Sequence, residues 1–370
     1  IFLVFSKKKI TINLKDKNLI VFLIFWVYLI FNSVVANNEI SWIRNISHIR
    51  FFIFIIAINQ LYSFNLINLN IFFKIWLIIL SVTAFDLIFQ FSFGFNIIGY
   101  ELPKNIYRNS GFFFEEMKAG GFLIGFLFLS LSFFLRKNTN NYKIFLLLLF
   151  IVISIFFTGE RGNTIRSLLF LSIFIILIPE NFFKLKKILF LSLISFMIII
   201  YLNSNFIKGR FSNNELINET GQKLNLKQKY YQTHYGEHFL TALLMFKDNI
   251  YFGVGNKNYR NKCYKYQPIL IQEYQLKGRG CATHPHQIYY EFFSEHGLFG
   301  FLVMAFLFFS IIKINLRSSY RQNPVMLSTL IYICLTFLPL MPAGSFFTSF
   351  GATIFWLNVA FFIMSKNIKY

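Results

Sequence analysis

Long apolar runs separated by short basic clusters constrain this chain more than any other feature. About ten of these runs are long enough, or nearly long enough, to cross a bilayer. They lie at about 19–36, 49–67, 71–93, 118–135, 143–158, 164–179, 187–203, 298–313, 324–341 and 346–364. Because 56% of the residues are hydrophobic and only 14% are charged, a soluble domain of this length is disfavoured. The sequence predicts an all-α, polytopic integral membrane protein with about ten transmembrane helices.

The basic clusters predict how these helices are oriented. If the runs alternate in direction, every cluster falls on one side of the membrane, and the positive-inside rule makes that side cytoplasmic. The clusters comprise Lys7 to Lys9, Lys15, Lys17, Arg136, Lys137, Lys143, Lys184, Lys186, Lys187, Lys313, Arg317, Arg321, Lys366 and Lys369. The net charge of +21 therefore does not indicate nucleic acid as a partner, since the basic residues sit between apolar runs as membrane-facing loops do.

One long polar segment divides the chain into three parts. Residues 1–203 are expected to form N-terminal transmembrane helices, residues 204–297 a large periplasmic loop, and residues 298–370 the C-terminal transmembrane helices. The outer face also receives shorter segments, at 94–117, 158–164 and 342–345. The chain begins without methionine, and Ile1 to Phe5 resemble the tail of an apolar run, so the first part is expected to be truncated at its N-terminus.

Arg161 is the first candidate for ligand binding. It lies in the turn Thr158-Gly-Glu-Arg-Gly-Asn-Thr164, and Arg166 follows one turn into the next run. Both fall on the predicted outer face, where the charge rule places few basic residues, and guanidinium groups bind phosphate bidentately. The alternative is an interfacial arginine that snorkels or pairs with Glu160 or with lipid headgroups. We favour the ligand-binding role.

Three further basic residues are candidates on the same face. Lys208 and Arg210 directly follow the seventh run, and Arg108 begins the segment that leads into the fourth. Several guanidinium groups that converge could hold a pyrophosphate without a metal. Lys208 and Arg210 could equally be a snorkelling pair at a helix end. Arg108 gives a weaker signal, because a solvated helix start would look much the same.

His286 is the candidate general base. Neutral imidazole can take a proton from a hydroxyl group at neutral pH, and His286 lies where the polar loop passes into an apolar run. If this stretch is helical, one face carries His286, Tyr289, Tyr290 and Phe293, which makes Tyr290 a candidate for substrate contact. A lone histidine is more often structural, and the competing histidines are His234, His238, His284 and His296.

Cys263 and Cys281 both lie in the long polar loop. If that loop faces an oxidising periplasm, they could form a disulfide. Metal binding with His284 and His286 is the competing interpretation, but the spacing matches no common zinc pattern. The disulfide is therefore favoured, and no metal site is predicted.

Several of these motifs together resemble the O-antigen ligase and O-antigen polymerase superfamily. The resemblance rests on the Arg161 turn, on Phe252-Gly-Val-Gly255 followed by Tyr259-Arg260, and on His286-Gln-Ile-Tyr-Tyr with Glu295-His-Gly-Leu-Phe-Gly300. Arg108 to Gly120 and Pro342 to Phe347 are similar to segments of its members. The order of the motifs is more specific than any one of them.

The resemblance implies a metal-independent glycosyltransferase with GT-C-like architecture and no cofactor, in the bacterial inner membrane with its active site facing the periplasm. It implies that Arg161 and Arg210 bind the pyrophosphate of an undecaprenyl-linked glycan and that His286 is the base, with inversion at the anomeric carbon. Two residues depart from the family pattern: Gln287 stands where asparagine is usual and Tyr290 where leucine is usual.

Three functions remain open. A ligase would transfer the glycan to a lipid A core sugar, whereas a polymerase would extend a growing polysaccharide on another lipid-linked unit. We favour the ligase slightly. A non-enzymatic lipid-linked glycan transporter would need charges along a path through the bilayer. Because charge within the runs is nearly limited to Lys74 and Asp86, the sequence favours chemistry at one membrane face.

Overall fold

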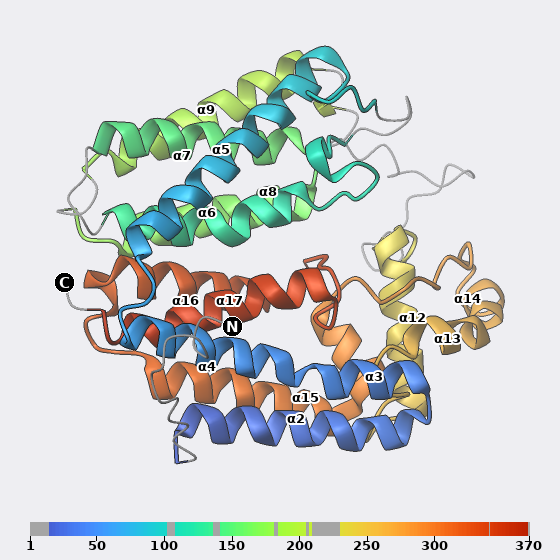
Figure 1. The fold of residues 1–370 in the computed structure, drawn as a ribbon. Coiled ribbons are helices and arrows are strands. Elements are labelled where there is room, and N and C mark those ends of the chain that lie inside the picture. Colours follow the sequence, from blue (N-terminus) through green and yellow to red (C-terminus); the bar gives the residue numbers. More distant parts are fainter. Residues whose placement is uncertain are drawn as a thin grey trace. The chain divides into compact units, whose positions relative to one another are not determined.

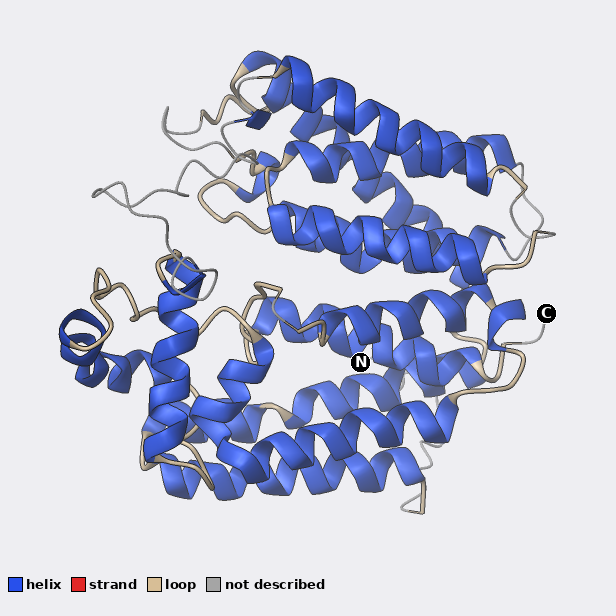
Figure 2. Ribbon diagram, turned by 180° about the vertical axis from the view of Figure 1, so that it is seen from behind, coloured by secondary structure: helices blue, strands red, loops and turns tan. Residues whose placement is uncertain are grey.

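The computed structural model describes residues 15–101, 108–135, 141–180, 184–204, 207–208, 230–339 and 341–368. Within these residues the chain forms helices and no strands (Figures 1 and 2), apart from one isolated bridge between Phe95 and Glu101. The predicted all-α class is thereby confirmed for the described part of the chain. Each predicted apolar run overlaps a helix, because the length and composition of such a run favour helix locally.

Among the described residues, five helical stretches are long and apolar enough to cross a membrane. They are Lys17–Ala36, Glu39–Ser63, Leu69–Phe93, Lys186–Asn203 and Ile288–Asn315. Shorter apolar helices lie at Ala119–Leu135, Tyr142–Phe157, Pro324–Thr336 and Ser349–Ser365. These lengths and compositions support a membrane protein.

The chain forms two compact units, each assembled from separated segments. The first comprises Ile1–Gln60, Asn214–Asn315 and Thr336–Trp356, and the second Leu61–Asn213, Leu316–Leu335 and Leu357–Tyr370. These units cut across the three consecutive parts predicted at 1–203, 204–297 and 298–370. The reason is that the first helix packs against the helix that follows the long loop. The same first helix is also hydrogen-bonded to the loop, through Asn32 to Asn256 N and through Ala36 O to Asn258.

In the first unit, α15 (Ile288–Asn315) packs lengthwise against α2 and, near its start, against α12 (Figure 1). The other helices are α2 (Lys17–Ala36), α3 (Glu39–Ser47), α4 (Ile49–Ser63), α12 (His234–Asp248), α13 (Tyr259–Lys262), η2 (Cys263–Tyr266) and α14 (Gln267–Gln272). The long polar loop is therefore a folded helical structure over residues 230–287.

In the second unit, α5 packs against α6 and α7, and α8 packs against both α6 and α7. Its helices are α5 (Leu69–Phe93), η1 (Gly111–Phe113), α6 (Ala119–Leu135), α7 (Asn141–Phe157), α8 (Arg161–Leu177), α9 (Lys186–Asn203) and η3 (Tyr320–Gln322). Helix α16 (Pro324–Thr336) lies in this unit up to Leu335, and α17 (Ser349–Ser365) joins it from Leu357.

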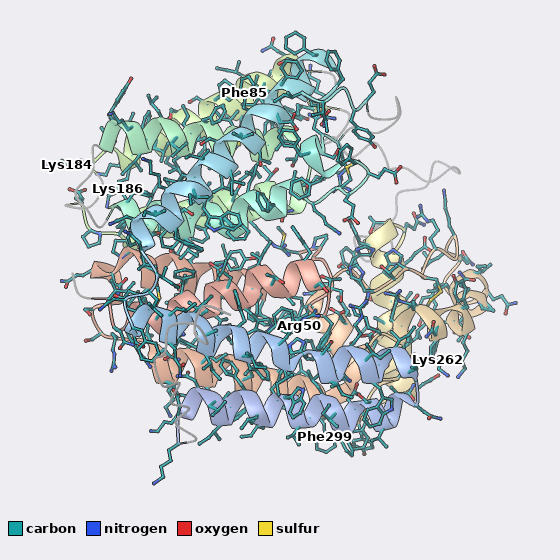
Figure 3. All side chains as sticks on the ribbon, viewed as in Figure 1. Arg50, Phe85, Lys184, Lys186, Lys262 and Phe299 are labelled. Atoms are coloured by element: carbon teal, nitrogen blue, oxygen red, sulfur yellow. A yellow bond between two sulfur atoms is a disulfide. The ribbon has the colours of Figure 1, made fainter. Side chains whose placement is uncertain are left out.

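Large apolar side chains remain exposed on the outer surfaces of the helices. Phe85 on α5 is 55% exposed and Phe299 on α15 is 47% exposed (Figure 3). Isolated exposed apolar residues are common in soluble proteins, but here they recur along most of the apolar helices. These surfaces are suited to lipid, in agreement with the membrane assignment.

Gly297 divides α15 into a polar first part and an apolar second part. Its backbone angles, φ 65° and ψ −163°, are not helical and interrupt the hydrogen-bond ladder. The loop after α12 restores these bonds. Val254 N donates to Ser294 O at 2.9 Å and Gly255 N to Glu295 O at 2.8 Å, while Leu298 N donates to Ile250 O at 2.8 Å. The kink therefore fastens residues 250–255 to α15.

Replacing Gly297 with alanine should destabilise the first unit by about 3 kcal/mol or more, because this backbone conformation suits only glycine. The added Cβ would also lie 2.5 Å from Phe252 N. We expect the detergent-solubilised variant to melt well below the wild type. Gly344→Ala is the matched control, since nothing lies within 4 Å of its Cβ position. Equal melting temperatures for both variants would contradict this account of the kink.

Candidate active site

The loop that carries His286 ends just before α15. The helix begins at Ile288, where Gln287 caps it: its Oε1 accepts a hydrogen bond from Tyr290 N at 3.1 Å. Gln287, which departs from the family pattern, thus caps this helix. His286 itself has φ 59° and lies outside the helix, so the predicted helical face shared by His286 and Tyr290 is not formed.

Three histidine rings cluster where this loop meets α12. The ring centroid of His286 lies 4.2 Å from that of His284 and 5.2 Å from that of His238. The Tyr235 ring is 5.5 Å from His286, in an edge-on arrangement. His286 is half-buried, so its ring combines firm packing with partial access to solvent. This is a suitable environment for a residue that exchanges protons.

Tyr290 has a packing role in the structure. Its ring stacks on Phe239 of α12 with centroids 4.5 Å apart and an angle of 14° between the planes. Such aromatic pairs stabilise helix packing. The Tyr290–Phe239 contact joins α15 to α12, and the predicted substrate contact of Tyr290 stays a prediction.

Two buried glutamates on α15 organise the chain around the histidine loop. Glu291 is 1% exposed and Glu295 is fully buried. Glu295 accepts hydrogen bonds from Lys257 N at 2.9 Å and Tyr259 N at 3.0 Å. Glu291 Oε1 lies 3.5 Å from Lys257 Nζ, and Lys257 is 5% exposed. The buried ammonium group of Lys257 therefore compensates the Glu291 carboxyl group, whereas Glu295 is held by backbone N–H donors.

The segment before α17 completes this network. Ser345 Oγ donates to Glu291 Oε1 and accepts from Lys257 Nζ, and Phe346 N donates to Glu291 Oε2 at 2.8 Å. Lys257 and Glu291 are not among the residues predicted from the sequence. The available signal was the pair of glutamates four residues apart at the start of an apolar run, because carboxylates at that spacing share one helix face and are rarely buried without partners.

The Arg161 turn belongs to the second unit. Arg161 is exposed and is the first residue of α8, and Glu160 is its N-cap position. The buried Glu160 side chain accepts a hydrogen bond from Gly120 N at 3.0 Å and one from Asn163 Nδ2. A cation at a helix N-terminus is electrostatically unfavourable, so the helix dipole does not account for Arg161.

The segment from Arg108 to Gly120 lies against this turn. Asn109 N donates to Thr158 O at 3.1 Å, and Asn109 Nδ2 donates to Phe157 O at 2.9 Å. Arg108 Nη2 lies 3.5 Å from Met117 O. The structure therefore brings together two segments that were predicted as separate candidates, and asparagine and glutamate side chains join them.

The other basic residues predicted to bind the ligand are Arg166, Lys208 and Arg210. Arg166 is half-buried on α8, and Lys208 lies in a short helical turn after α9. Arg210 lies outside the described residues. Arg108, Arg161 and Arg166 thus belong to the second unit, whereas His286 and Tyr290 belong to the first.

Cys263 and Cys281 form a disulfide, with Cα atoms 5.3 Å apart. Cys263 is fully buried in a small core with Ala242, Met245, Tyr259 and Tyr266. The Tyr259 hydroxyl donates a hydrogen bond to Gly280 O at 2.6 Å. The disulfide and this hydrogen bond therefore join the same two segments, residues 259–263 and 280–281. Among the described residues, no group of three or more His, Cys, Asp or Glu side chains is arranged to hold a metal ion.

The pKa of His284 should make the first unit sensitive to acid. Burial and, secondarily, the nearby Lys257 charge lower this pKa from 6.5 to about 4. Between these values the unfolded chain takes up a proton that the folded chain does not. The free energy of unfolding should therefore fall by up to about 1.4 kcal/mol per pH unit as pH drops from 6.5 towards 4. Thermal melting of wild type and His284→Gln should differ in slope over this window, and parallel curves would contradict the assignment.

Comparison with known families agrees with the motifs. Residues 145–305 match the family model described as O-Antigen ligase, which confirms the resemblance to this superfamily. The matched range contains Arg161, the disulfide and His286, and it ends within α15. No curated protein matches the chain.

Proposed function

We propose that this chain, whose residues 145–305 match the O-antigen ligase family, is a membrane glycosyltransferase that transfers a glycan from undecaprenyl pyrophosphate to an acceptor hydroxyl. The proposal is carried by one observation: the matched range includes both the arginine turn and the histidine loop, which supply the two kinds of group that this chemistry needs. The acceptor we favour is a sugar of the lipid A core.

The reaction needs charge stabilisation and one proton transfer. The acceptor oxygen attacks the anomeric carbon, the bond from that carbon to the pyrophosphate oxygen breaks, and undecaprenyl pyrophosphate leaves with the bonding electrons. Arg161, with Arg166, Arg108, Lys208 and Arg210, stabilises the charge that develops on the pyrophosphate. His286 takes the acceptor proton. Direct displacement inverts the configuration at the anomeric carbon, without a metal ion or cofactor.

The disulfide supports a periplasmic location for the histidine loop. Disulfides persist in oxidising compartments such as the bacterial periplasm and are rare in the cytosol. We therefore propose that the protein lies in the bacterial inner membrane with this loop on the periplasmic side, where lipid-linked glycans and lipid A core acceptors would meet it.

The acceptor distinguishes a ligase from a polymerase. The purified protein would be reconstituted in liposomes with an undecaprenyl pyrophosphate-linked glycan and offered either lipid A core or additional lipid-linked glycan. A ligase produces glycan joined to the core, whereas a polymerase produces longer lipid-linked chains. Movement of the intact donor across the bilayer without transfer to either acceptor would identify a transporter and reject the proposal.

A further inference from the structure

The Glu291 carboxyl group lies at the centre of contacts that the proposed mechanism does not use. It accepts hydrogen bonds from Ser345 Oγ and Phe346 N and forms an ion pair with Lys257. A buried pair of this kind is weak evidence for stability, because desolvation offsets its Coulombic attraction and apolar residues often serve as well. The positions of the groups that this ion pair holds say more about its role than its contribution to stability does.

The segment that Glu291 holds also contacts the histidine loop. Ala343 N donates a hydrogen bond to His286 O at 2.6 Å, and Ala343 lies two residues before Ser345. Tyr289, near the start of α15, donates from its hydroxyl to Phe337 O at 2.7 Å. Phe337 is therefore bonded to Tyr289, and Ala343 is bonded to His286 itself.

Lys257 connects a third segment to the same point. It has φ 63°, a conformation that is uncommon for residues other than glycine. In this conformation its backbone N–H reaches Glu295 while its side chain reaches Glu291 and Ser345. A buried network fixes side-chain directions when every member has partners, and each polar group of this network has at least one.

We propose that Glu291 and Lys257 are positioning residues, which orient His286 through the Ala343–Phe346 segment. The carboxylate of Glu291 fixes Ser345 and Phe346, this segment fixes the backbone of His286, and Lys257 locks the carboxylate in place. The kinetic part of this inference rests on the proposed transferase function. Its structural part, the coupling between Glu291 and the histidine loop, is independent of that function.

The test is Glu291→Gln in the full-length protein, which keeps the side-chain shape but removes the charge. Hydrogen–deuterium exchange should become at least about tenfold faster in peptides covering 283–290 and 342–347, and remain unchanged in α12. In the liposome transfer assay, kcat should fall about 10- to 100-fold with KM for the donor within about threefold of wild type. Glu291→Gln should also lower the melting temperature, because it leaves the buried Lys257 charge without its carboxylate partner. Adding Lys257→Met should restore the melting temperature but not kcat.

Glu273→Gln is the matched control, because Glu273 is exposed in the same unit and should leave all three measurements unchanged. If Glu291→Gln does not fold, Ser345→Ala removes only the bridging hydroxyl and should accelerate exchange in the same two peptides. Exchange at 283–290 that stays at the wild-type rate, or acceleration throughout the unit, would overturn the proposal. If the wild type transfers no glycan, the proposed function fails, while the exchange data still decide the coupling.

Discussion

Replacing His286 with alanine is expected to lower kcat for glycan transfer by about 10²- to 10⁴-fold, the usual contribution of a general base. The donor should still bind, because the proposed mechanism assigns its pyrophosphate to the arginines and not to the imidazole. The liposome assay, run at saturating donor and acceptor, measures this loss directly. His286 is half-buried with φ 59°, so alanine adds little strain beyond that already present, and the melting temperature should change by only a few degrees.

The neighbouring histidine provides the control for this assignment. The pKa of His284 is lowered to about 4 by burial, which makes it a weak proton acceptor at neutral pH. His284→Gln should therefore reduce kcat much less than His286→Ala, by no more than about tenfold. A large loss from His284→Gln together with near-normal activity of His286→Ala would transfer the role of base to His284.

Helix positions could be predicted from the sequence because they depend on local composition. Each apolar run produces a helix, and the chain before Gly297 continues that helix although it is polar. The apolar run at 298–313 leaves out these ten residues, although a helix through Tyr289, Tyr290 and Phe293 was considered, since hydropathy alone does not recognise a helix start with buried glutamates. Their partners, Lys257 and Ser345, are distant in sequence.

The candidate site was predictable in its residue types and less so in its arrangement. The His286 loop and the Arg161 turn were recognised because each lies at a junction between polar and apolar sequence. The capping role of Gln287, the clustering of His238 with His286 and the Glu291 network depend on tertiary packing. A local sequence pattern does not indicate which distant residues will be in contact. The division of the chain into two units also depends on contacts between distant segments.

Arg161 gives the second large expected effect. Arg161→Ala should lower kcat/KM for the lipid-linked donor by about 10²- to 10³-fold, a loss typical of removing one group that stabilises developing charge. Arg161→Lys should recover only part of it, because an ammonium group cannot form the bidentate contact of a guanidinium group. The melting temperature, in contrast to kcat/KM, should change little. Arg161 begins α8, where a positive charge opposes the helix dipole, so both the alanine variant and the wild type should melt at similar temperatures, with alanine no lower.

Arg317→Ala is the matched control for this prediction, since Arg317 is exposed and lies on the predicted cytoplasmic face. It should leave kcat/KM unchanged, which separates a specific role of Arg161 from a general effect of arginine at the membrane surface. Transfer by Arg161→Ala within twofold of the wild-type rate would remove Arg161 from the pyrophosphate site. A melting temperature well below that of the wild type would instead assign Arg161 to folding, because the lost activity would then follow the lost structure.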